Sequence, residues 1–177
     1  MFRIIPLTLA MTVVCIGQTG SNRAVISDKA RDRLIREVRH EIVTLPFFDV
    51  FDNIAFRVDG YTVTLMGQVT DPTVKGDAER AVKGIEGVER VNNQIEVLPL
   101  SPNDDRLRRA LFVAIYGYDG LQRYALPVIK PIRIIVKNGR VSLEGVVANE
   151  MDKQLAYMRA NGVPGLFAVT NNLKVEK

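Results

Sequence analysis

One segment of this sequence occurs twice. Shifting the chain by 78 residues places Ile54 to Val97 on Ile132 to Val175 without a gap, and 13 of the 44 paired positions are identical. The identical pairs include three pairs of glycines, Gly67/Gly145, Gly84/Gly162 and Gly87/Gly165. Glycines shared at fixed spacing rarely arise by chance, because each usually marks a backbone position that other residues tolerate poorly. The chain is therefore predicted to contain the same folding unit twice.

The repeat also extends upstream of this segment. Asp32 to Leu34 matches Asp105 to Leu107, but at an offset of 73 residues. The second copy therefore has five additional residues between its first helix and its first strand. These residues lie within the aromatic stretch from Tyr116 to Tyr124.

Each copy predicts a helix, two strands, a second helix and a third strand. In the first copy an amphipathic helix is indicated by apolar residues three or four apart, namely Ala30, Leu34, Val38, Ile42 and Leu45. Pro46 is expected to end this helix. The next apolar residues alternate with polar ones, as in a half-buried hairpin. Its turn is predicted at Gly60-Tyr61, and at Asn138-Gly139 in the second copy, so that Val58 faces Val63 and Val136 faces Val141.

The second helix of each copy is predicted to end at a glycine, Gly84 in one copy and Gly162 in the other. The fold class is therefore α+β, with two tandem small modules of αββαβ order. Each module should have a three-stranded sheet against which its two helices pack. We expect the modules to span residues 24–98 and 104–177, joined by a proline-containing linker.

The N-terminal residues resemble a secretion signal. Arg3 is followed by an apolar run over residues 4–16, which suits a signal peptide and is too short to span a bilayer. We expect a signal peptide over residues 1–17, and hence a periplasmic or outer-membrane-associated protein. Cys15, the only cysteine, leaves lipid anchoring open, although Val14 before it departs from the usual lipoprotein pattern.

Two sequence elements together resemble the BON domain, the bacterial OsmY and nodulation module. The first is Val63-Thr64-Leu65-Met66-Gly67-Gln68-Val69, with its counterpart from Val141 to Val147. The second is Gly87-Val88-Glu89-Arg90-Val91-Asn92-Asn93, with its counterpart from Gly165 to Asn171. The resemblance implies two small α/β sandwich modules, each a three-stranded mixed sheet with two helices on one face. The same resemblance implies a non-catalytic envelope protein connected with envelope integrity or osmotic stress. It also implies binding of anionic phospholipid, and it gives no catalytic residues.

The residues themselves point away from catalysis. His40 is the only histidine, and neither a second metal-binding histidine nor a nucleophile motif accompanies it. We expect it to be an exposed or capping helix residue. No phosphate-binding loop or calcium loop is recognisable, so we expect no metal, cofactor or small-molecule substrate. An export signal also argues against a nucleic-acid partner.

Charge is distributed unevenly between the halves. Residues 21–100 have a net charge of −2, whereas residues 101–177 have a net charge of +5. Strand alternation is expected to place Arg133, Ile135 and Lys137 together on the outer face of the second sheet. The candidate membrane- or anion-binding residues are Arg106, Arg108, Arg109, Tyr116, Tyr118, Arg123, Tyr124, Arg133, Lys137 and Arg140. Tyrosines and arginines of this kind suit a bilayer interface, but they equally suit the edge of a core and a solvated surface.

These observations favour an adaptor that binds an anionic phospholipid surface and other envelope proteins. A soluble periplasmic chaperone or assembly factor for envelope proteins is the alternative. A hydrolase using His40 is a distant third hypothesis.

Overall fold

The computed structural model describes residues 27–176, so the predicted signal peptide and Cys15 lie outside the described residues. The first module contains α1 (Asp28–Val43), β1 (Asn53–Asp59), β2 (Thr62–Val69), α2 (Pro72–Lys83) and β3 (Arg90–Val97). The second contains α3 (Pro102–Tyr116), the short 3-10 helix η1 (Asp119–Tyr124), β4 (Ile132–Lys137), β5 (Arg140–Val147), α4 (Glu150–Asn161), β6 (Ala168–Asn171) and β7 (Lys174–Val175). Within residues 27–176, no helix has both the length and the apolar character needed to cross a bilayer.

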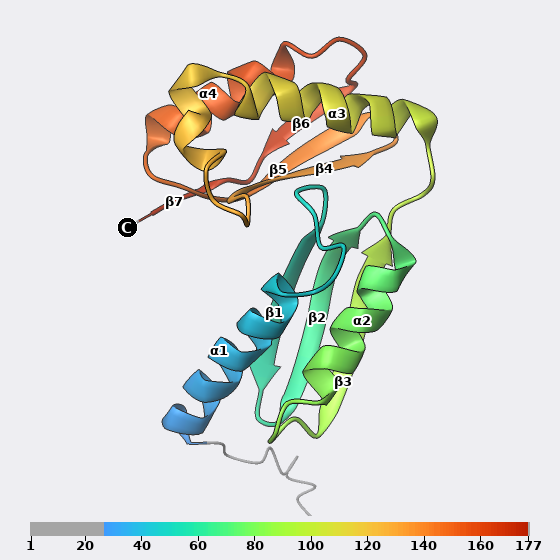
Figure 1. Cartoon of the computed structure of the whole chain (residues 1–177), viewed down its shortest axis with the longest axis vertical. Coiled ribbons are helices and arrows are strands. Elements are labelled where there is room, and N and C mark those ends of the chain that lie inside the picture. The colour runs from blue at the N-terminus through green and yellow to red at the C-terminus, as the bar shows by residue number, and fades with distance from the viewer. Residues whose placement is uncertain (1–26, 177) are drawn as a thin grey trace, which may run out of the picture.

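The predicted α+β architecture with two tandem modules is confirmed (Figure 1). In each module the first two strands form an antiparallel hairpin, and the closing strand pairs parallel with the second one. Two helices cover one face of each sheet, and each module has its own apolar core. In the second module the closing strand is divided, because β6 and β7 both pair with β5.

The hairpin turns follow the predicted registers, with Val58 opposite Val63 and Val136 opposite Val141. Asn138 and Gly139 both have positive φ, as a type I′ turn requires, while Gly60 has φ +61° at the first central position, as in type II′. Both turns match the right-handed twist of paired strands.

The repeated glycines serve two different purposes. Gly84 and Gly162 are the C-caps of α2 and α4, as predicted, but both have right-handed backbone conformation. Gly67 and Gly145 instead have φ +117°, and a Cβ atom on Gly145 would lie 1.9 Å from the carbonyl oxygen of Pro131. At these strand positions the close approach of the neighbouring backbone requires glycine.

The repeated asparagines explain another identical pair. The side chain of Asn93 donates to the carbonyl of Lys75 in α2, and that of Asn171 donates to the carbonyl of Lys153 in α4. Each asparagine thus ties the closing strand to the second helix of its own module. The repeat has preserved this cross-link along with the core.

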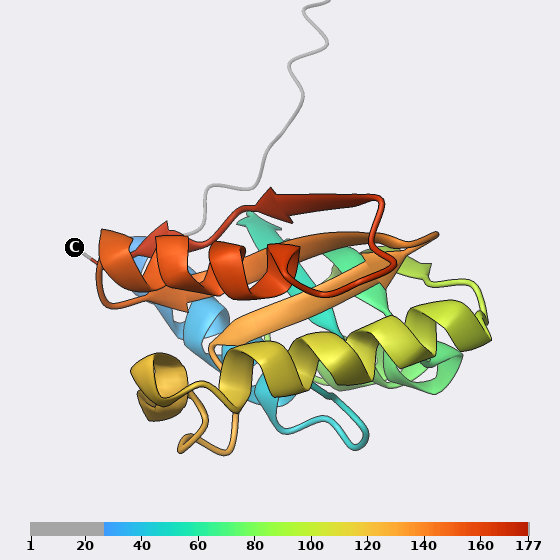
Figure 2. The ribbon, with the colours of Figure 1, turned by 90° about the horizontal axis from the view of Figure 1, so that it is seen from above.

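The modules meet where the outer face of the second sheet lies across one end of the first module (Figures 1 and 2). The segment before β1 reaches into the second module: Val50 is 4% exposed and belongs to the second module's core. Its carbonyl accepts a hydrogen bond of 2.9 Å from the N–H of Ile134 in β4. Phe51 packs edge-on against Phe112 of α3, with ring centroids 6.4 Å apart. One module therefore completes the core of the other.

Candidate membrane-docking surface

The predicted basic strand face lies at the junction between the modules. Arg133 donates to the carbonyl of Asp49 at 2.7 Å, and its guanidinium lies 4.5 Å from the ring centroid of Phe48. Desolvation by burial lowers the pKa of Arg133 from its ordinary value. Ile135, between the two basic residues, is only 5% exposed. Lys137 forms an ion pair with Glu96 of β3. Arg133 is thus held against the first module, whereas Lys137 is about half-exposed and lines, together with Ile135 and Arg140, a hollow of about 540 Å³.

Three further candidates, Arg108, Tyr116 and Tyr124, are buried inside the second module. The Arg108 side chain donates to the carbonyl of Val136 at 2.8 Å and pairs with Asp105, and its Nε is buried without a hydrogen-bond partner. The Tyr116 hydroxyl donates to the carbonyl of Ile132 at 2.5 Å. Burial raises the pKa of Tyr116 well above its ordinary value. Arg108 and Tyr116 thus tie α3 to β4, and no bilayer could reach them.

Tyr124, the last residue of η1, belongs to a polar cluster with Arg123 and buried Asp152. Its hydroxyl donates to Asp152 at 2.5 Å and accepts from the N–H of Ala148 at 2.8 Å. Arg123 pairs with the same carboxylate at 2.8 Å, although its own side chain is half-exposed. The pKa of Tyr124 is raised, chiefly by burial and then by the bond to Asp152. The insertion and α4 are thereby joined.

The remaining candidates are exposed but dispersed. Arg106 and Arg109 lie on α3, Arg140 follows the second hairpin turn, and Tyr118 follows α3. Arg106 also bonds the side chain of Asn103, at 3.0 Å. The structure thus brings together only part of the predicted set on any one open surface.

A groove between α3 and α4 is open, has largely apolar walls and carries basic side chains. Its volume is about 550 Å³, and it runs along the two helices that lie side by side over the sheet in Figure 2. Val113 is 68% exposed and Met158 is 60% exposed on its walls. Arg109 and Arg159 line it as well. We call these four residues, Val113, Met158, Arg109 and Arg159, the helix-face site.

Arg159 is held in place at this site. Its Nε donates to the carbonyl of Ala114 at 3.1 Å, and its guanidinium lies 4.7 Å from the ring centroid of Tyr118. The bond crosses from α4 to α3, so the cation is fixed beside exposed Val113 and Met158. Such a pairing of an apolar patch with fixed cations suits an interface between water and an anionic amphiphile.

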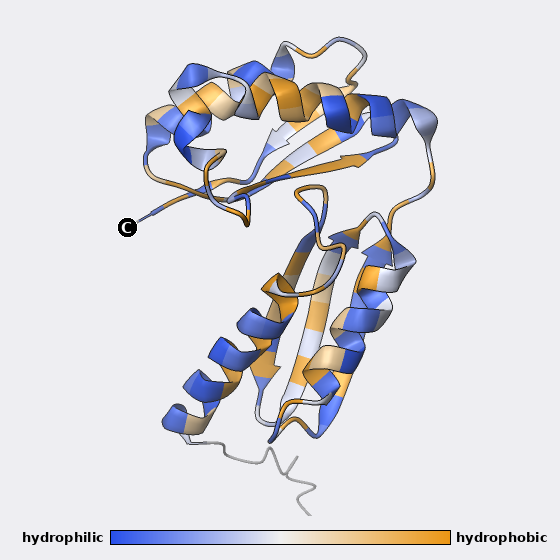
Figure 3. Ribbon diagram, in the orientation of Figure 1, coloured by the Kyte–Doolittle hydropathy of each residue, from blue (hydrophilic) through white to orange (hydrophobic). Residues whose placement is uncertain are grey.

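Sequence reasoning found Arg109 and Tyr118 but missed Val113, Met158 and Arg159. The signal for Val113 was present, because it falls outside the stripe formed by Leu107, Leu111 and Ile115, which are all fully buried. Figure 3 shows α3 changing from hydrophilic at its N-terminal end to hydrophobic along its middle. Arg159 could not be found in the same way, since its position against α3 depends on how the helices pack. His40 lies exposed in the last turn of α1, as predicted.

Comparison with known proteins now identifies the family. The family model of the BON domain matches residues 26–99 and again residues 121–177. The chain belongs to the BON domain family. The first match covers the first module, and the second match covers the second module from Leu121 onward, after α3. Membership supports a non-enzymatic protein of the cell envelope. No curated protein matches this sequence.

Solved structures give only a distant likeness to this BON protein. One is CdsD, a structural protein of the Type III secretion system of Chlamydia trachomatis, at 13% identity, covering 82% of this chain and 94% of that chain with a TM-score of 0.31. Another is the C-terminal domain of CdsD, at 13% identity, covering 81% and 98% with a TM-score of 0.29. At these scores the likeness carries no argument about function.

Proposed function

We propose that this protein is an envelope adaptor that docks to anionic phospholipid through the helix-face site of its second BON domain. The observation that carries this proposal is that two exposed apolar side chains, Val113 and Met158, line one groove together with the cations Arg109 and Arg159. Val113 and Met158 would enter the headgroup region, while Arg109 and Arg159 would meet phosphate. The site faces away from the first module, which would stay free to contact envelope proteins. Exposed Met151 at the start of α4 adds apolar surface to the same helix layer.

The energetics favour weak, reversible docking. Each basic side chain near an anionic surface contributes about 1 kcal/mol, and this contribution falls with rising salt. Two apolar side chains add roughly 1.5–3 kcal/mol each if they become fully buried. The expected behaviour is therefore salt-sensitive binding that needs both charge and apolar contact.

Co-sedimentation with vesicles of defined composition tests the proposal. The protein should sediment with vesicles containing phosphatidylglycerol and should remain in solution with pure phosphatidylcholine. Arg109→Glu combined with Arg159→Glu should weaken binding by more than about tenfold, since two attractions become repulsions. Val113→Asp should act in the same direction.

The matched control reverses two exposed arginines of the first domain, Arg36→Glu with Arg90→Glu, which changes the net charge equally. That variant should bind as the wild type does. If both double variants lose binding equally, attraction is set by net charge and the helix-face site is rejected. If neither vesicle type binds but the protein suppresses aggregation of unfolded envelope proteins, the chaperone alternative is favoured instead.

A further inference from the structure

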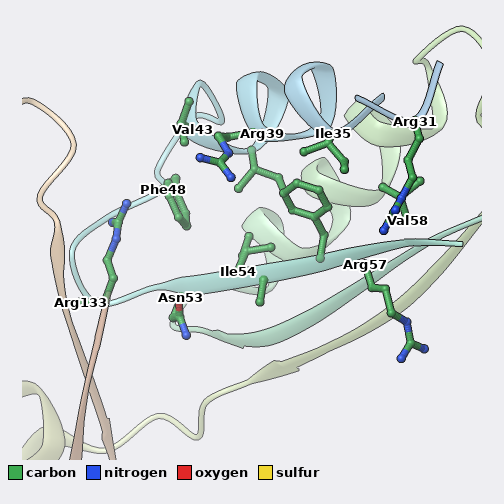
Figure 4. A pocket seen from close by; sticks show the side chains of 13 residues that line it. Arg31, Ile35, Arg39, Val43, Phe48, Asn53, Ile54, Arg57, Val58 and Arg133 are labelled. Carbon is green, nitrogen blue, oxygen red and sulfur yellow. The ribbon is translucent and has the colours of Figure 1, made fainter. Parts of the chain in front are cut away.

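The first BON domain has an open groove between its first helix and its first strand. In the second BON domain, the equivalent place is covered by residues of the first domain. The groove lies between α1 and the edge strand β1, has a volume of about 460 Å³, and is shown in Figure 4. Ile35, Arg39 and Val43 line it from the helix, and Ile54 and Phe56 line it from the strand. In the second domain the same place, between α3 and β4, receives Val50 and Phe51.

The repeat allows the two edges to be compared atom by atom. Alternate residues of an antiparallel edge strand turn their N–H groups away from the partner strand. In β4 two such groups have acceptors: Ile134 donates to the carbonyl of Val50 at 2.9 Å, and Ile132 donates to the Tyr116 hydroxyl at 3.2 Å. In β1 the equivalent residues are Phe56 and Ile54.

Neither acceptor has a counterpart in the first domain. Val43 occupies the position of Tyr116 and has no hydroxyl, and within residues 27–176 no chain segment lies where Val50 lies in the second domain. An edge strand with outward N–H groups beside an apolar groove is suited to accept another extended segment. Phe48 and Arg133 line one end of the groove, and beyond them the first domain presents the docking site of the second domain without its occupant.

The second domain also contains a segment that corresponds in the repeat to the one that fills its own groove. Val50 and Phe51 correspond in the repeat to Val128 and Ile129, just before β4. Val128 is 97% exposed, Ile129 43% and neighbouring Leu126 81%. Single exposed apolar residues are ordinary, but three within four residues at the docking position of the repeat require a reason.

Charge at the rim of the junction supports the same pairing. Within the chain, Lys137 of the second domain pairs with Glu96 of the first. The repeat places Asp59 at the position of Lys137 and Lys174 at the position of Glu96. The groove-bearing domain thus contributes the negative residue instead of the positive one, and the domain that supplies the segment contributes the positive residue. A junction formed between Asp59 of one copy and Lys174 of the next would thus keep its ion pair.

We propose that the α1–β1 groove binds residues 126–129 of a second copy of this chain, repeating between molecules the junction found within one. The carbonyl of Val128 would accept from the N–H of Phe56, and Ile129 would lie along the aliphatic part of Arg39, which stands where Phe112 stands in the second domain. This contact is heterologous, since one copy offers the groove and the next offers the segment. Repetition gives a head-to-tail row or a closed ring.

The affinity in solution should be modest. Within the chain, the short linker gives an effective concentration of about 1 mM, which two separate molecules lack. Sedimentation velocity over protein concentrations from about 1 µM to about 1 mM, without lipid, should therefore show a steady rise in sedimentation coefficient.

Complementary variants test the direction of the contact. Val128→Asp with Ile129→Asp disables the segment, and Ile35→Glu disables the groove. A glutamate at position 35 lies four residues from both Arg31 and Arg39, so α1 should tolerate it. Each variant alone should stay monomeric, with self-association at least about tenfold weaker than wild type. An equimolar mixture of the two should form a 1:1 dimer and nothing larger, because one intact groove meets one intact segment.

A charge exchange gives a second readout. Asp59→Lys should weaken association, and adding Lys174→Asp in the same chain should restore it. Met151→Asp changes another exposed apolar side chain outside the contact and should associate as the wild type does. A wild-type protein that stays monomeric at about 1 mM overturns the proposal. So does a mixture of the two disabled variants that fails to form dimers although both variants are folded by circular dichroism.

Discussion

The N–H of Thr70 in the first domain donates to the carboxylate of Asp52 at 2.7 Å, whereas the equivalent N–H of Ala148 donates to the hydroxyl of Tyr124 at 2.8 Å. Asp52 comes from the loop before β1, and Tyr124 comes from the insertion after α3. Both side chains are buried, and both satisfy the chain just after the second strand of the hairpin. The same backbone requirement is therefore met by different residues from different segments.

The two domains differ more sharply in buried charge. The second domain buries Asp104, Arg108 and Asp152, and in the repeat Asp152 corresponds to fully buried Val74 of the first domain. Asp104 accepts from the N–H groups of Asn138 and Gly139, at 2.8 Å each, and so holds the second hairpin turn. The comparison teaches that the repeat preserved apolar positions and glycines, while each copy acquired its own polar network around them.

The largest expected loss of stability comes from replacing the strand glycine that both domains share. Gly67→Ala and Gly145→Ala should each destabilise the protein by about 3 kcal/mol or more, because the new Cβ would lie within 2.0 Å of a backbone oxygen at a φ that alanine resists. Chemical denaturation measures both. Gly76→Ala in α2 is the control: a Cβ there meets nothing within 4 Å, and stability should rise by about 0.5–1 kcal/mol. Equal losses for all three variants would contradict this explanation.

Val50 and Val128 are equivalent in sequence but opposite in burial, at 4% and 97% exposed. Val50→Ala should cost about 2 kcal/mol through lost apolar contact. Since Val50 belongs to the core of the second domain, the loss should appear in hydrogen-exchange protection of β4 and α3. Val128→Ala in dilute solution should change stability by less than about 0.5 kcal/mol. A loss of protection confined to the first domain would refute the assignment of Val50.

Alkaline pH should lower the stability of the second domain more than that of the first. The pKa values of Tyr116 and Tyr124 are raised in the folded protein, so the folded state binds their protons more tightly than the unfolded state does. Their contribution is complete below the unfolded pKa of about 10 and is lost above it, with a slope of at most about 1.4 kcal/mol per pH unit for one proton. Methyl resonances of Val63 and Val141 would report on one domain each.

The second domain should therefore open first as the pH rises above about 10. An unchanged alkaline transition in Tyr116→Phe with Tyr124→Phe would show that other groups cause it.

The smallest expected effect concerns the rim of the junction. Glu96→Gln removes the partner of Lys137, but both side chains are nearly half-exposed, at 43% and 47%. Such a pair contributes less than about 1 kcal/mol, and the difference from wild type should shrink further in high salt. Thermal denaturation at two salt concentrations measures it. A loss above about 2 kcal/mol would mean that the ion pair, and not Val50, holds the domains together.

Prediction from sequence succeeded where the cause is local or periodic. The hairpin registers follow from turn residues and alternation, and the paired domains follow from repeated apolar positions. The candidate site was predicted less well, for a physical reason. Alternation placed Arg133 and Lys137 on the outer sheet face, yet whether that face meets solvent, a membrane or another domain depends on residues far away in the chain. Tyr116 and Tyr124 were ambiguous for the same reason, since an amphipathic ring suits a core edge as well as a bilayer.

The sequence by itself determined that one αββαβ unit occurs twice, because glycine, proline and periodic burial act over a few residues. Only the tertiary structure decided that Val50 enters the neighbouring core and that Arg133 stacks on Phe48. It alone left the α1–β1 groove open and set Arg159 beside α3. These outcomes depend on how two finished domains meet, and the free energy of that contact is spread over residues that no local pattern connects.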